Sequence, residues 1–231
     1  MYNIKTDGGL GDIINKHLVS IGLESPVFKS DKEVPTCDKL SKLAYHYTSI
    51  HNTIGLDLSN DSITDTPNRL AKTLLFETTS GLDYNNFPKI TTVKNDGMYD
   101  DSVTVNDILV MSMCEHHWER IIMRVSISYI PDDKVIGLSK LARIAEFFAA
   151  RPIIQERYTK QVAETLIKIL GDNANVGVHV RGIHLCMLSR GVKSPCGTTT
   201  TKSLNGHYRN DSNVRNYFLN GIDTTKSILP E

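Results

Sequence analysis

The stretch RVSISYI, from Arg124 to Ile130, decides the fold of this chain. Its apolar and polar side chains alternate, and Pro131 with two aspartates follows directly. An alternation of period two predicts a β-strand with one buried face, and proline with aspartate predicts the turn that ends it. The same period begins near residue 103, and further strands are predicted at residues 176–180 and Ile183–Leu188.

Two helical patterns lie between these strands, over residues 139–150 and 154–170. In each, apolar side chains recur every three or four residues, which indicates a helix with one buried stripe. Strands, a helix pair and strands again predict an α+β fold with the helices on one face of a largely antiparallel sheet. The expected inward positions are Leu141, Ile144, Phe148, Tyr158, Val162, Leu166 and Ile169, and Gly171 ends the second helix.

The part of the chain before these strands is also helical in pattern. Periodic apolar residues predict helices at 10–23 and 40–56. A third is expected to begin at Asp65-Thr66-Pro67, with Asp65 as its capping side chain and Gly81 at its end. We therefore divide the chain into an N-terminal helical extension, residues 1–64, and a main domain, residues 65–231. The apolar stripe of the third helix is Leu70, Leu74 and Leu75, and a closing helix is expected at 211–222.

Composition argues against several classes of function. The 231 residues carry 26 Lys plus Arg and 26 Asp plus Glu, so overall charge gives no case for a nucleic-acid or anionic-membrane partner. The sequence has no apolar run of membrane-spanning length, and its first ten residues lack the apolar segment of a secretion signal. We therefore expect a soluble cytoplasmic protein whose four cysteines are reduced thiols or metal ligands.

One group of side chains has the pattern of a metal site. Cys114 and His117 lie three positions apart, a spacing that lets both reach one ion from a tight turn. In the strand expected at 183–188, His184 and Cys186 would project from the same face. Structural zinc sites normally use four protein ligands, whereas catalytic sites use three and keep a position for water. We therefore predict a catalytic zinc ion on Cys114, His117 and Cys186.

The residues alone leave other interpretations open. Cys186 also has the pattern of a small buried apolar side chain. If Cys37 or Cys196, both expected in loops, supplied a fourth ligand, the zinc site would be structural. Cys114 beside imidazoles is also compatible with a cysteine nucleophile. The charged and imidazole side chains next to it could be ordinary surface residues.

The motifs of this chain, taken together, resemble those of GTP cyclohydrolase I. They occur in the family's order between Thr66 and Thr201, and their joint occurrence is highly specific. The matching segments are TPNRLAK at 66–72, SGLDY at 80–84, CEHH at 114–117, VIGLSKLARI at 135–144, QER at 155–157, HLC at 184–186 and SRG at 189–191.

This resemblance implies a fold, an assembly and a reaction. Residues 65–231 would form the catalytic domain with the tunnelling fold, in which antiparallel strands and a helix pair from each subunit close into a ring-shaped barrel. The assembly is typically a homodecamer with active sites between subunits. Such enzymes convert GTP and water to formate and 7,8-dihydroneopterin triphosphate, the first step of tetrahydrofolate and other pterin or deazaguanine biosynthesis. Their zinc is held by the positions that match Cys114, His117 and Cys186.

The resemblance also implies roles for side chains outside the metal site. His184 would protonate N7 of guanine while water activated at the zinc attacks C8, and His116 would move a second proton. Guanine would bind to Glu156 and Gln155. The remaining catalytic candidates are Ser139 and Glu115, and the phosphate-binding candidates are Arg69, Lys72, Lys140, Arg143 and Arg190.

Other functions compete with this interpretation. On spacing alone Glu156 would be a surface carboxylate paired with Lys160, and only the resemblance reverses that preference. A nitrile-reducing relative of the same fold would use a thiol nucleophile and a nicotinamide cofactor. A purine- or pterin-binding protein without cyclohydrolase activity would not need to activate water. The three-ligand set together with His116 and His184 favours the cyclohydrolase over both.

Overall fold

The central feature of the fold is a five-stranded sheet, seen in a computed structural model that describes residues 5–28, 34–191, 193 and 197–228. All neighbouring strands are antiparallel except β5, which runs parallel to β2. The alternating residues Arg124–Ile130 belong to the central strand β3, with Ile127 opposite Val105 and Val178. In spatial order the strands are β5 (Pro152–Ile153), β2 (Val103–Cys114), β3 (Arg120–Ile130), β6 (Asn175–His184) and β7 (Thr199–Leu204).

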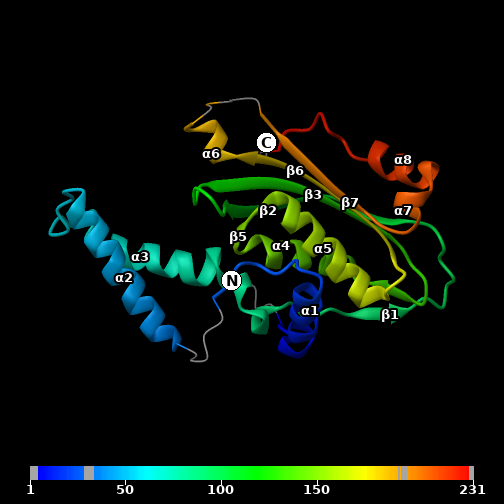
Figure 1. The fold of residues 1–231 in the computed structure, drawn as a ribbon, viewed down its shortest axis with the longest axis horizontal. Helices are drawn as coiled ribbons and strands as arrows, with labels where there is room; N and C mark the ends of the chain where they lie inside the picture. The colour runs from blue at the N-terminus through cyan, green and yellow to red at the C-terminus, as the bar shows by residue number, and fades with distance from the viewer. Residues whose placement is uncertain (1–4, 29–33, 192, 194–196, 229–231) are drawn as a thin grey trace. The chain divides into compact units, whose positions relative to one another are not determined.

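One face of this sheet forms the hydrophobic core with two helices. Val125, Ile127 and Tyr129 are fully buried on this face, as the alternation predicts. They pack in one cluster with α4 (Leu138–Ala149) and α5 (Gln155–Leu170), which lie side by side beneath the sheet (Figure 1). Full burial of one aliphatic side chain is worth about 1.5 to 3 kcal/mol, so this face dominates the stability of the sheet.

The opposite face is also covered, which corrects the expectation that helices lie on one face only. The short helices α7 (His207–Asn210) and α8 (Ser212–Asn220) pack against β6 there (Figure 1). Tyr208 Oη lies 2.6 Å from Ser128 Oγ, and a Cβ added at Gly177 would lie 3.0 Å from the Phe218 ring. Two polar positions of the alternating pattern, Ser126 and Ser128, are therefore buried too, and Ser128 finds its partner beneath this cover.

The chain separates into two compact units, one of residues 1–25 with 81–231 and one of residues 26–80. The first unit contains the sheet and α1 (Gly8–Ser20), whose first turn is capped by Asp7 through Leu10 N–H at 3.0 Å. It also holds a small antiparallel pair, β1 (Thr92–Lys94) with β4 (Lys134–Ile136), and the single turns η2 (Ser80–Leu82), which begins at the unit boundary, and η3 (Tyr84–Asn86). The division expected at residues 64 and 65 stays a prediction.

The second unit consists mainly of α2 (Thr36–Thr53) and α3 (Thr66–Lys72), which continues as the π-helical turn η1 (Thr73–Thr78). Asp65 precedes α3 as expected, but its side chain makes no capping hydrogen bond to the helix backbone. Its carboxylate instead accepts from Asn68 Nδ2 at 3.1 Å and Arg69 Nε at 3.2 Å, because these donors lie one turn ahead of it. Leu74 is buried in this unit, whereas Leu70 is exposed.

The prediction of a strand over Ile183–Leu188 is wrong in its second half. β6 ends at His184, and Leu185–Leu188 form the one-turn helix α6. The β-branched side chains that favour a strand stop at Ile183, and the leucines and methionine that follow favour a helix. In the described part of the chain, no helix is both long and apolar enough to cross a membrane.

Candidate metal centre

The first two candidate ligands lie in a tight turn, residues 114–118, that we call the Cys114 turn. Cys114 ends β2, and its N–H donates to Glu119 O at 2.7 Å while Trp118 N–H donates to Cys114 O at 2.9 Å. Trp118 itself has a φ of +57°, which lets the chain reverse into β3. The turn brings His117 Nδ1 to 3.9 Å from Cys114 Sγ.

Glu115 fixes this turn to its neighbours. Its N–H donates to Ile153 O at 3.0 Å, and its carboxylate lies 2.7 Å from Arg157 Nη1 at the start of α5. The two side chains of this ion pair are only 22% and 25% exposed, so water screens their attraction less than at an open surface. The carboxylate of Glu115 is therefore engaged in holding the turn.

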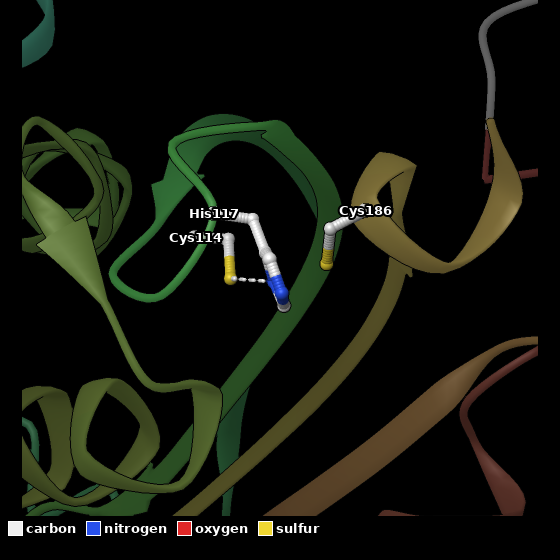
Figure 2. A group of neighbouring side chains, drawn as sticks. All are labelled: Cys114, His117 and Cys186. Atoms are coloured by element: carbon white, nitrogen blue, oxygen red, sulfur yellow. Dashed lines mark hydrogen bonds between the residues drawn. The ribbon is translucent and has the colours of Figure 1, made fainter. Parts of the chain in front are cut away.

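The third candidate ligand comes from a segment that we call the α6 arm, residues 184–188. Cys186 lies in the middle of α6, and Ser189 closes the helix by donating from N and Oγ to Leu185 O, each at 2.8 Å. The helical turn, rather than the strand parity expected from the sequence, directs the Cys186 side chain. It points toward Cys114 and His117 across the gap between the two segments (Figure 2).

These three side chains form a group that could bind a metal ion. Their ligand atoms all lie within 4.8 Å of one another, and both thiols are buried. In a tetrahedral zinc site with Zn–S near 2.3 Å and Zn–N near 2.0 Å, ligand atoms lie about 3.5 to 3.8 Å apart. Small side-chain rotations would therefore bring all three donors to one ion, and sulfur with imidazole nitrogen is the donor set that zinc prefers.

The surroundings of Cys186 favour its neutral thiol over the charged thiolate. Burial raises the pKa of the Cys186 thiol, and the neighbouring Cys114 thiol raises it further, while Arg190 acts in the opposite direction. A divalent cation would reverse this balance, since thiolate is the form that binds a metal. The donor set thus fits a metal site better than a cysteine nucleophile.

Among the described residues, no further cysteine belongs to this group. Cys37 is exposed in α2 of the second unit, and Cys196 lies outside the described residues. The ligand group of the described chain therefore has three members.

The first turn of α5 connects both ligand segments. Arg157 holds the Cys114 turn through Glu115, and Gln155 Oε1 lies 2.8 Å from His184 Nε2 at the base of the α6 arm. Glu156 lies between these two anchors and is exposed. Burial lowers the pKa of His184, and the charge of Glu156 partly opposes this. A carboxylate and a half-buried imidazole thus lie next to the ligand group.

The histidine pair of the Cys114 turn is open to solvent. His116 and His117 are both exposed, with their ring centroids 6.3 Å apart. His117 contributes to the ligand group, while His116 is free to act on a molecule that approaches from outside. Within the described residues Glu156 forms no ion pair with Lys160, the partner expected from spacing alone.

Within the first unit, the candidate phosphate-binding residues lie in two separate places. Arg190 follows the α6 arm and acts electrostatically on Cys186, so it lies near the ligand group. Ser139 and Lys140 instead follow β4, which Tyr129 Oη ties to the far end of β3 through Ile136 N at 2.9 Å. Ile121 of β3 pairs with His184, and Tyr129 lies eight positions further along the same strand. About 26 Å of strand therefore separates these two places.

The other candidate cations lie on two helices. Arg143 lies one turn further along α4 than Ser139, and Arg69 and Lys72 belong to α3 of the second unit. All of these positions remain predicted binding residues.

Sequence reasoning missed the contacts that hold the site in place. The Arg157–Glu115 ion pair joins positions 42 apart, and the side-chain hydrogen bonds of Gln155 join α5 to both β6 and β7. No local spacing signals such contacts. The QER motif itself was visible, but the roles of its first and third side chains emerge only in the folded chain.

Comparisons with known proteins agree on one family. A sequence model described as GTP cyclohydrolase I matches residues 43–223. The chain is 42% identical over 211 residues to GTP cyclohydrolase 1 of Yersinia enterocolitica, which covers 91% of this chain and 94% of the relative. It is 43% identical over 210 residues to GTP cyclohydrolase 1 of an Escherichia coli strain, with the same coverage of 91% and 94%.

Proposed function

The chain belongs to the GTP cyclohydrolase I family and has the activity of that family, and from this premise we propose which of its residues perform the reaction. GTP and water are converted to formate and 7,8-dihydroneopterin triphosphate, which begins the biosynthesis of tetrahydrofolate and other pterins. The observation that carries the assignment of roles is the ligand group of Cys114, His117 and Cys186 with His184 and Glu156 beside it.

Zinc is the metal that this donor set fits, with Cys114, His117 and Cys186 as its ligands. A zinc ion with three protein ligands activates a water in its fourth position by lowering the pKa of that water to about 7. The protein supplies the remainder of the chemistry. Both thiols are buried and His117 is exposed, so the open side of the site faces solvent and an incoming base.

His184 is the proton donor for opening the imidazole ring of guanine. When water adds at C8, the C8–N bond can break only if the departing nitrogen receives a proton, and His184 stands next to the ligand group for that transfer. His116, exposed on the Cys114 turn, moves the second proton as formate leaves. Ser139 would assist the later ribose rearrangement.

Glu156 selects guanine. Its carboxylate can accept from both N1–H and the exocyclic amino group, two donors that adenine does not present in this arrangement. Because Glu156 is exposed at the N-terminal turn of α5 between two anchored neighbours, its backbone position is fixed while its oxygens stay free for the base. This makes Glu156 the specificity residue of the site.

The triphosphate requires cations that one chain spreads over both ends of its sheet. The site is complete if Lys140 and Arg143 of one subunit lie against the ligand group of another, with Arg69 and Lys72 added from α3. Strand β7 is an edge strand of the sheet, and a neighbouring chain that pairs with it would both cover the edge and build such a site. We infer a ring-shaped homodecamer of the tunnelling fold with its active sites between subunits.

The experiment that tests the function is incubation of the purified, zinc-replete assembly with GTP. Formate and a fluorescent pterin should appear in equal amounts, and ATP should give neither. A chain that binds GTP but releases no formate would be a purine- or pterin-binding protein of this fold. Size measurement of the same sample by light scattering tests the decamer separately.

A further inference from the structure

A chain of hydrogen bonds runs behind His184, and the direction of each bond is determined. Thr159 Oγ1 lies 2.8 Å from Gln155 O, and because a carbonyl oxygen only accepts, Thr159 must donate its single hydrogen there. Thr201 Oγ1 lies 2.6 Å from Thr159 Oγ1, so Thr201 must be the donor of that bond. The oxygen of Thr201 is then left to accept from Gln155 Nε2 at 3.1 Å.

The same bonds determine how the Gln155 amide is turned. Its Nε2 also faces Thr199 O at 3.1 Å and Val180 O at 3.4 Å, both of which only accept. A flipped amide would place Oε1 against these two carbonyl oxygens, a contact in which neither side can supply a hydrogen. The amide nitrogen therefore faces the strands, and Oε1 faces His184 Nε2 at 2.8 Å.

From this geometry we propose that Gln155 is a positioning residue that keeps the fixed ring hydrogen of His184 on Nε2. An amide oxygen can only accept, so the Nε2 nitrogen must be the donor of the 2.8 Å bond. Nδ1 is then the ring atom that gives a proton to guanine and recovers one afterwards. The proposal rests on the proposed role of His184 and specifies which of its two nitrogens acts.

This role replaces contact of the Gln155 side chain with guanine. Its amide oxygen accepts from His184, and its amide hydrogens point to acceptors on β6 and β7. The side chain is also only 1% exposed. A group that is fully bonded and buried has little left to offer a substrate, whereas it is well placed to hold a ring that exchanges protons.

The first test replaces Gln155 by methionine, which has a similar volume but no acceptor. In the zinc-replete assembly we expect kcat to fall on the order of 10- to 100-fold, as for other partners that orient a functional histidine. KM for GTP and zinc content should stay within about twofold, since substrate and metal contacts are unchanged. A fall in zinc content together with kcat would overturn the proposal in favour of a structural role.

A second set of variants tests the next hydrogen bond in this series, from Gln155 Nε2 to Thr201 Oγ1. Thr201→Val removes the acceptor that orients the amide and should lower kcat by a smaller factor, whereas Thr201→Ser keeps the hydroxyl and should restore it. Thr165→Val is the matched control, because Thr165 is fully buried on α5 and its Oγ1 has no hydrogen-bond partner among the described residues. Equal activity of both Thr201 variants would contradict the proposal even if Gln155→Met fails to fold.

A direct readout does not depend on activity. Solid-state ¹⁵N NMR of the sedimented assembly with labelled histidine distinguishes the two neutral ring forms, and the spectrum of His184→Asn identifies the His184 signals. The wild type should carry hydrogen on Nε2, and Gln155→Met should give a mixture of both forms. A wild-type ring with hydrogen on Nδ1 would refute the role of Gln155, whereas full turnover by His184→Asn would refute the proposed function instead.

Discussion

The two segments that bring ligands to the metal group differ in how firmly the chain holds them. The Cys114 turn is closed by two backbone hydrogen bonds, tied to β5 through Glu115 N–H, and anchored to α5 by the Arg157 ion pair. The α6 arm has one helical turn closed by Ser189 and one side-chain bond from His184. The turn is therefore prearranged by a β-hairpin, while the α6 arm depends more on what it binds.

This difference matters because the two segments would share one ion but have separate further tasks in the proposed reaction. The Cys114 turn presents His116 to solvent, whereas the α6 arm begins with His184, the proposed proton donor, and leads to a phosphate-binding candidate, Arg190. A metal that bridges the two segments would therefore hold His184, the activated water and Arg190 in one arrangement. Five changes to the chain or its metal test that view, in order of decreasing effect.

Loss of a ligand from either segment should have the same, largest effect. Cys114→Ser and Cys186→Ser each leave two ligands, so zinc affinity and formate release should fall by more than the roughly 100-fold cost of losing an outer partner. Metal analysis of the purified variants measures this, with Cys37→Ser as the control because Cys37 is exposed in α2. Retention of zinc by Cys186→Ser would show that the α6 arm is not a ligand segment.

Removal of the acid from the α6 arm should separate chemistry from metal binding. His184→Ala should keep its zinc but lose turnover by about 10²- to 10⁴-fold, the usual contribution of a positioned proton donor. Formate release and metal content are measured on the same sample. His207→Ala, which changes an exposed histidine of α7, should leave both unaltered.

Glu156, which lies between Gln155 and Arg157, should affect GTP binding alone. Glu156→Gln exchanges a charged acceptor for a neutral amide, a loss of about 1.5 to 3 kcal/mol or roughly 10- to 100-fold in KM for GTP. Zinc content should not change. Steady-state kinetics measures the effect, and Glu146→Gln, at an exposed carboxylate of α4, is the control. Zinc loss in Glu156→Gln would show that the residue supports the metal group rather than the base.

Release of the Cys114 turn from α5 should leave it held less firmly, as the α6 arm is. Arg157→Met removes the partner of Glu115 and should weaken zinc affinity about tenfold. This is the lower end of the effect of losing a residue that supports a metal ligand from outside. Competition with a fluorescent chelator measures the affinity. Lys168→Met, also on α5, removes an exposed ion pair with Asp172 just beyond the end of that helix and should have no effect. Equal affinities for both variants would mean that backbone bonds alone hold the turn.

Metal removal should loosen the two segments unequally. After chelation, amide exchange should accelerate by roughly one order of magnitude in residues 185–189, where a single turn of helix protects few amides. Residues 114–118 should change less, because the hairpin bonds remain. Hydrogen exchange with mass spectrometry resolves the two peptides, and equal acceleration in both would remove the distinction between the segments.

Much of the fold was predictable because its signals are local. The alternation from Arg124 to Ile130 identified the central strand, and the stripes of Tyr158, Val162 and Leu166 identified the helix that covers it. The limits of α6 were not predictable from the same rule. Periodicity describes which face of a regular element is buried, and a one-turn helix is too short to show any period.

The sequence by itself determined which chemistry was possible: a thiol and an imidazole three positions apart, a second thiol beside a histidine, and motifs whose order matches one family. Those facts depend only on covalent spacing. Only the tertiary structure decided that Cys186 reaches the other ligands from a helix, that Gln155 turns its oxygen to His184, and that Arg157 anchors the Cys114 turn. Such contacts join residues between 29 and 72 positions apart: pairing of β2, β3 and β6 brings Cys186 to Cys114, and packing of α5 against the sheet brings Gln155 to His184 and Arg157 to Glu115.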